Sequence, residues 1–237
     1  YVLFELSRRY EGFRLLPFSL DYSKIRHLLR PGLSAMTIYM GQNFMVQGLV
    51  SIIGIGLGSA QVVIFSTART LVNVVKQVVG IVNLSVTSEF SYAYGAENFQ
   101  LLRKLFRMAS LGNLVLASVL LLILFFSGDW IMHVWTNDQV SISQPFFAFI
   151  LISTLINAWW NVSLVLLVST NKLGRTGILF LLSALILLAI NAAGIKYFGL
   201  TGVAATIIGF EMAMMFIMWA ASSKVLQSKS GITVIST

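Results

Sequence analysis

The chain alternates long apolar stretches with short polar connections, and this alternation restricts its fold more than any other feature. A helix needs about 20 apolar residues to cross roughly 30 Å of hydrocarbon at about 1.5 Å per residue. We expect about six such spans, at 32–56, 61–88, 109–127, 145–169, 176–195 and 199–221. The sequence therefore predicts an all-α integral membrane protein with about six transmembrane helices.

Composition supports this fold class and removes several kinds of chemistry. Of the 237 residues, 57% are hydrophobic and 10% are charged, and the mean hydropathy of +0.87 is typical of a membrane protein. The chain has no cysteine, which excludes disulfides and thiolate metal sites, and we expect His27 and His133 in separate connections. We expect no metal and no cofactor, and we find no catalytic constellation of an enzyme.

The second span, 61–88, carries a polar stripe along one helical face. At about 100° per residue, its members fall within roughly 40° of a common direction. They are Arg69, Asn73, Lys76, Gly80, Asn83 and Thr87. A cation near the middle of a span costs about 2.5 to 3.5 kcal/mol on insertion scales, so it persists where it faces water, a substrate or an ion partner. The stripe predicts a water-filled cavity; the alternative is ion pairing inside a sealed bundle.

Other spans carry polar residues at a similar depth. Asn43 and Gln47 are one helical turn apart in the first span, and Asn157 and Asn161 are one turn apart in the fourth. We therefore predict that several spans contribute to one substrate-binding cavity. Its predicted residues are Arg69, Asn73, Lys76, Asn83, Asn43, Gln47, Asn157 and Asn161.

Glu211 is the one acidic residue inside the predicted spans. A carboxylate in an apolar span requires a partner or a proton. Two readings stay open: Glu211 forms a neutralising pair with Lys76, or it exchanges a proton or sodium ion during transport. With Arg69 and Lys76 against one acid, the cavity would suit an anionic substrate, and its amides would suit hydroxyl groups.

The basic residues predict the orientation. Of the 16 Lys and Arg residues, Arg69 and Lys76 lie inside the second span, and all others except Lys196 lie before the first span, in alternate connections or after the last span. By the positive-inside rule these connections and both termini are cytoplasmic. The net charge of +8 then reflects loops that lie against anionic lipid. Nucleic acid binding is not expected.

Five segments of the chain form a familiar set of motifs: 66–71 (STARTL), 88–95 (SEFSYAYG), 128–136 (GDWIMHVWT), 169–172 (STNK) and 198–204 (FGLTGVA). In these segments the chain resembles polysaccharide flippases of the multidrug/oligosaccharidyl-lipid/polysaccharide exporter superfamily. Ser88 departs from the family pattern, in which a proline commonly precedes the glutamate. The resemblance covers nearly the whole chain.

The resemblance implies a MATE-like transporter of two helical bundles, of which this chain forms the C-terminal half. Residues 1–31 would be a cytoplasmic linker, 32–223 a six-helix transmembrane bundle and 224–237 a cytoplasmic tail. The N-terminal transmembrane half would lie outside this chain. The location would be the bacterial inner membrane.

The same resemblance implies a function. The protein would flip an anionic, undecaprenyl-pyrophosphate-linked oligosaccharide by alternating access for surface polysaccharide (O-antigen) synthesis. In the second of the two readings of Glu211 given above, a proton or sodium gradient would be coupled to transport through that residue. Its partners would be this lipid-linked sugar, membrane lipids and polysaccharide polymerases. Nearby alternatives are a multidrug and toxin extrusion cation antiporter and a peptidoglycan-precursor flippase. From other classes, a membrane glycosyltransferase and a non-transporting assembly subunit remain open.

Overall fold

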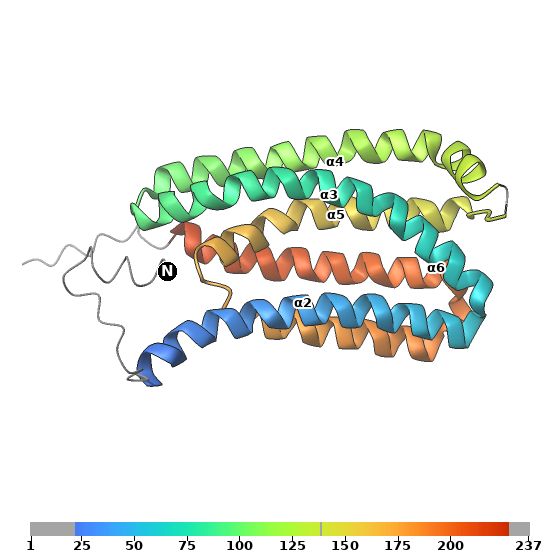
Figure 1. The fold of residues 1–237 in the computed structure, drawn as a ribbon, viewed down its shortest axis with the longest axis horizontal. Helices are drawn as coiled ribbons and strands as arrows, with labels where there is room; N and C mark the ends of the chain where they lie inside the picture. Colours follow the sequence, from blue (N-terminus) through green and yellow to red (C-terminus); the bar gives the residue numbers. More distant parts are fainter. Residues whose placement is uncertain (1–21, 138, 228–237) are drawn as a thin grey trace, which may run out of the picture.

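The computed structural model describes residues 22–137 and 139–227, and their regular secondary structure is entirely α-helical (Figure 1). The helices run side by side as one elongated bundle. They are α2 (Tyr22–Leu57), α3 (Ser59–Gly95), α4 (Phe99–Thr136), α5 (Gln144–Ser169) and α6 (Thr176–Gln227). The connections between them are short, so neighbouring helices are antiparallel.

The longest helix, α6, is a hairpin of two arms that meet at Gly199. Its 52 residues would extend about 78 Å if straight, at about 1.5 Å per residue, but Gly199 has φ 59° and ψ −161°. That backbone region is open essentially to glycine alone. The Asn191 amide donates to the Thr206 hydroxyl at 2.8 Å, which requires the arms to fold back. The predicted fifth and sixth spans are therefore the first and second arms of α6.

The two ends of the bundle differ in charge. One end, which we call the basic end, contains the α3–α4 and α5–α6 connections, the start of α2 and the end of α6 (Figure 1). Its basic residues within or near these segments are Arg103, Lys104, Arg107, Lys172, Arg175 and Lys224. The fold thus collects at one end the residues that the sequence assigns to one side of a membrane. The cytoplasmic assignment itself stays a prediction.

Three glycines let α2 approach the first arm of α6 closely, and we call this contact the α2–α6 seam. A Cβ atom at Gly41 would lie 2.7 Å from the Phe180 ring, one at Gly48 2.7 Å from Leu188, and one at Gly56 2.5 Å from Ile195. All three distances are shorter than a Cβ contact permits. Small residues at regular helical intervals are a common means of helix packing in membranes.

The outside of the bundle is apolar as well as the inside. Ile55, Ile81, Phe126 and Phe216 are among many large apolar side chains that are more than half exposed. In water such a surface would be unusual, because soluble proteins rarely expose large contiguous apolar areas. All five helices contain segments long and apolar enough to span a membrane, as a multi-pass membrane protein requires. The predicted all-helical membrane fold class is confirmed to this extent.

The structure moves several predicted boundaries. Helix α2 begins within the predicted 1–31 linker and α6 continues to Gln227 in the predicted tail; residues 1–21 and 228–237 lie outside the described residues. Helix α4 continues to Thr136, so His133 lies in its last turn rather than in a connection, and His27 lies in α2. The prediction that both histidines lie in connections was wrong. The helices extend beyond the apolar segments from which their ends were predicted.

Candidate functional site

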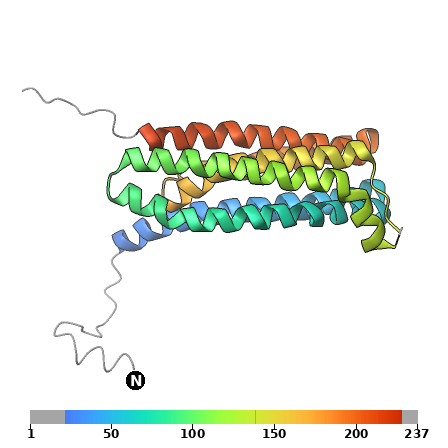
Figure 2. The same ribbon diagram turned by 90° about the horizontal axis from the view of Figure 1, so that it is seen from above.

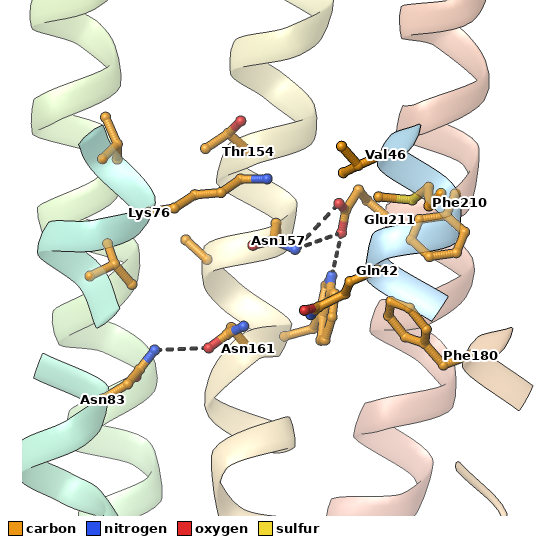
Figure 3. A pocket seen from close by; sticks show the side chains of 15 residues that line it. Gln42, Val46, Lys76, Asn83, Thr154, Asn157, Asn161, Phe180, Phe210 and Glu211 are labelled. Atoms are coloured by element: carbon orange, nitrogen blue, oxygen red, sulfur yellow. Dashed lines mark hydrogen bonds between the residues drawn. The ribbon is translucent and has the colours of Figure 1, made fainter. Parts of the chain in front are cut away.

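A polar cavity lies inside the bundle between α2, α3, α5 and both arms of α6 (Figure 3). Its volume is about 260 Å³. Its apolar lining includes Val75, Val79, Phe180 and Phe210. The polar lining residues are Gln42, Lys76, Asn83, Thr154, Asn157, Asn161 and Glu211. A cavity with this many polar groups inside an apolar bundle can hold water or a polar ligand.

Glu211 lies on the second arm of α6 and is 3% exposed. Its carboxylate accepts hydrogen bonds from the Asn157 amide, at 3.3 and 3.1 Å, and from Trp160 Nε1, at 2.6 Å. Both donors come from α5, so these bonds tie α5 to α6. Such hydrogen bonds compensate part of the cost of burying a polar group in an apolar bundle.

Lys76 reaches from α3 across the cavity toward α5 and Glu211 (Figure 3). In the described part of the chain, the hydrogen bonds to the Glu211 carboxylate come from Asn157 and Trp160 and none comes from Lys76. The ammonium group therefore keeps its donors for a ligand or water. The two readings of Glu211, a neutralising pair with Lys76 and exchange of a proton or sodium ion, both stay predictions.

Three asparagines, Asn113, Asn83 and Asn161, join α4, α3 and α5 through hydrogen bonds between their side chains. The Asn113 amide donates to Asn83 Oδ1 at 2.7 Å, and the Asn83 amide donates to Asn161 Oδ1 at 2.9 Å. Asn113 is fully buried and Asn83 is 5% exposed. This series of hydrogen bonds ends at Asn161, which lines the cavity and whose amide nitrogen can still donate there.

Helix α5 supplies the central face of the cavity. Thr154, Asn157, Ala158 and Asn161 follow spacings of three and four residues, which place them on one side of a helix. Thr154 Oγ1 donates to the Ile150 carbonyl at 2.9 Å, so it is satisfied within its own helix. The amides of Asn157 and Asn161 are instead directed to neighbouring helices. The residues of α5 that line the cavity are therefore those that the helical repeat places on one face.

The structure separates the predicted site residues into two groups. Lys76, Asn83, Asn157, Asn161 and Glu211 line one cavity, whereas the other four predicted residues are not part of its lining. Those four are Asn43, Gln47, Arg69 and Asn73. The predicted common cavity is thus built from α3, α5 and α6, with a different contribution from α2.

On α2, residues other than the predicted ones line the cavity. Asn43 and Gln47 are exposed, and the Asn43 amide donates to the Tyr39 carbonyl within its own helix at 3.0 Å. Gln42 and Val46 line the cavity instead. The α2–α6 seam sets this rotation, because seating Gly41 and Gly48 against α6 turns the neighbouring Asn43 outward.

On α3 the stripe divides along its length. Arg69 lies about two turns from Lys76, toward the end opposite the basic end. It is half-buried, and its Nε and Nη1 atoms are buried without a hydrogen-bond partner in the described structure. Asn73 is also half-buried. Only Lys76 and Asn83 of the four predicted α3 residues line the cavity.

Three residues that hold or line the site were not predicted: Gln42, Asn113 and Trp160. Trp160 lies three residues after Asn157, which places it near the same helical face, and its indole N–H needs an acceptor when buried. Asn113 lies alone in an apolar span, where a polar residue usually has an interhelical partner. These signals were present in the sequence, but none of them identifies the partner.

The arrangement offers groups that can bind a polar ligand. The described residues contain no group of three or more His, Cys, Asp or Glu side chains that could hold a metal ion. The cavity offers amides and one hydroxyl for hydrogen bonding, one cation and one anion. Comparisons with protein-family profiles, characterised proteins and solved structures found no match to this chain.

Proposed function

We propose that this chain forms one bundle of a membrane transporter that flips an anionic, lipid-linked oligosaccharide by alternating access. The observation that supports it most is the polar cavity between α2, α3, α5 and α6. Lys76 lines this cavity inside an otherwise apolar bundle. A charge at that depth costs about 2.5 to 3.5 kcal/mol on insertion scales, which favours a functional role.

Lys76 is the proposed anion-binding residue. It is exposed, whereas Glu211 is buried and already accepts hydrogen bonds from Asn157 and Trp160. An ammonium group with free donors is a point charge for a phosphate or an acidic sugar. In this proposal Lys76 contacts the pyrophosphate or an acidic sugar while the lipid tail stays in the bilayer.

The amides are the proposed hydroxyl-binding groups. Gln42, Asn157 and Asn161 carry both donors and acceptors, which match sugar hydroxyls. The volume of about 260 Å³ is smaller than that of a typical ligand pocket, about 300 to 1,000 Å³, so it accommodates part of an oligosaccharide. The exposed Asn43 and Gln47 on α2 extend the polar surface, and a second bundle facing α2 and α3 would complete the site.

A cation antiporter is the second candidate, and one observation favours it. Glu211 is a buried carboxylate at the cavity edge, a group that can exchange a proton or sodium ion. Lys76 counts against a cationic substrate, because a like charge in the cavity repels it. We therefore assign Glu211 to ion coupling and Lys76 to the anionic substrate within one transporter.

Cysteine labelling tests whether the cavity is open to water. The chain has no natural cysteine, so single cysteines at Lys76 and Asn157 report the cavity, and cysteines at the lipid-exposed Val74 and Ile81 are controls. In the full-length protein in membranes, a membrane-impermeant thiol reagent should label the first pair and not the second. Equal protection of all four positions would contradict a water-filled cavity.

Transport measurement tests the substrate. Lys76→Gln should reduce flipping of a fluorescent undecaprenyl-pyrophosphate-linked sugar in proteoliposomes by about 10- to 100-fold, since a hydrogen bond to a charged group contributes about 1.5 to 3 kcal/mol. Lys196→Gln removes an exposed lysine far from the cavity and should leave the rate unchanged. Normal flipping by Lys76→Gln would reject the proposed role of Lys76.

A further inference from the structure

A second hollow lies on the outside of the bundle, toward the basic end. It runs between α4 and the second arm of α6 over α5, and we call it the α4–α6 groove. Figure 2 shows α4 (green) beside the second arm of α6 (red). The groove has a volume of about 500 Å³, within the about 300 to 1,000 Å³ of ligand sites. Its apolar lining includes Phe106, Leu111, Trp159, Phe216, Trp219 and Leu226.

The lining of the groove faces the surroundings of the bundle. Trp159 is 49% exposed, Phe216 60% and Trp219 65%. An apolar hollow does not hold ordered water, and an empty one loses the dispersion contacts of its lining. In a bilayer the molecules beside this surface are lipids. A hydrocarbon chain is therefore the occupant that the lining favours.

Two arginines add a charged element to the same groove. Arg103 and Arg107 line it, are exposed, and lie four residues apart on one side of α4. Arg103 Nη1 donates to the Leu226 carbonyl at 3.2 Å, which uses one of the five N–H donors of a guanidinium. No acidic residue is among those that line the groove in the described chain. Two guanidinium groups without a competing carboxylate match a phosphate.

We propose that the α4–α6 groove binds one anionic phospholipid of the surrounding leaflet. Its phosphate lies against Arg103 and Arg107, and one acyl chain lies along Trp159, Phe216 and Trp219. Basic pockets between transmembrane helices are recognised binding places for anionic headgroups. This site is separate from the cavity and goes beyond the proposed transport function, because it holds a resident lipid whatever the transported substrate.

Trp160 connects this groove to the cavity. It lines both hollows, and its Nε1 donates to Glu211 at 2.6 Å. A lipid chain in the groove packs against the indole that positions the Glu211 carboxylate. Occupancy of the groove therefore supports the wall of the cavity from outside.

Mass spectrometry of the intact, full-length protein extracted from vesicles of equal phosphatidylglycerol and phosphatidylcholine tests the headgroup. The unaltered protein should retain one phosphatidylglycerol. Arg103→Gln combined with Arg107→Gln should lower the ratio of bound phosphatidylglycerol to bound phosphatidylcholine by at least tenfold. Each arginine near an anionic headgroup contributes about 1 kcal/mol, which corresponds to about fivefold. Lys172→Gln combined with Arg175→Gln removes two charges from the basic end outside the groove and should retain the preference.

A second variant tests the acyl chain. Ser110 lines the groove, and Ser110→Trp should fill it and abolish retention of both lipids while the circular dichroism spectrum stays helical. Retention by this variant, equal retention of the two lipids by the unaltered protein, or a preference that survives loss of both arginines would each overturn the proposal. Displacement of phosphatidylglycerol by a lower concentration of undecaprenyl phosphate would overturn the choice of a phospholipid and assign the groove to a carrier lipid.

Discussion

The α2–α6 seam and the polar cavity hold their helices together in different ways. In the seam, Gly41 and Gly48 bring two helix backbones close, and apolar side chains of α6 fill the space above each glycine. Around the cavity, Glu211 joins α6 to α5 through hydrogen bonds from Asn157 and Trp160. The seam depends on shape and the cavity on hydrogen bonding.

This difference explains which parts of the bundle can change. A close-packed seam has few alternative arrangements, because its contacts depend on a single fit of shape. A cavity bridged by side-chain hydrogen bonds can exchange those partners for water or a ligand. We therefore expect α2 and the first arm of α6 to move as a unit, while α3, α5 and the second arm adjust around the cavity.

The largest expected effect is on the seam. Gly48→Leu places a side chain where a Cβ already meets Leu188 at 2.7 Å, so overpacking should lower the free energy of unfolding by about 3 kcal/mol. SDS titration in mixed micelles measures this change. Gly112→Leu on α4 is the matched control, since a Cβ there has no neighbour within 4 Å. Equal stability of the two variants would show that the seam is not close-packed.

A smaller effect should follow from one hydrogen bond at the cavity. Trp160→Phe keeps an aromatic ring but removes the N–H that Glu211 accepts, so the free energy of unfolding should fall by about 2 kcal/mol. Its neighbour Trp159 is half-exposed to the membrane side, and Trp159→Phe should change stability little. The same SDS titration compares the two, and the prediction fails if Trp159→Phe costs as much.

The smallest expected effect concerns the amide chain. Asn113→Leu removes the donor to Asn83 and should lower the free energy of unfolding by about 0.6 kcal/mol, the average measured for interhelical hydrogen bonds in membranes, and by no more than about 1.7 kcal/mol, the largest value measured. The exposed Asn43 bonds within its own helix, so Asn43→Leu should be neutral. Thermal unfolding in detergent can resolve this pair. If Asn43→Leu lowered the stability more than Asn113→Leu, the placement of Asn43 on the outside of the bundle would be contradicted.

Much of the fold was predictable because hydropathy is a local property. Runs of apolar residues predicted every helix that the structure describes, and the alternation of basic connections predicted which helix ends lie together. Boundaries were less accurate: α4 continues to Thr136, beyond its apolar centre. Helix continuation there depends on backbone hydrogen bonding, which polar residues such as Asp129 and His133 also permit.

The candidate site was predictable in part. Lys76, Asn157 and Glu211 stood out because charged and amide side chains are costly in apolar spans. Asn43 was predicted to line the cavity, but the adjacent Gln42 lines it instead, since polarity alone does not separate the two residues. The rotation of a helix about its axis depends on what it packs against, and the glycines of α2 determine that rotation.

The sequence by itself determined that this protein is a bundle of long apolar helices with a few polar residues inside, because both properties depend on residue type and spacing along one chain. Only the tertiary structure decided the partners. Glu211 bonds to residues more than fifty positions away in α5, and Arg69 is kept out of the cavity that Lys76 enters. Pairings across helices depend on packing distance and rotation, which no local pattern contains.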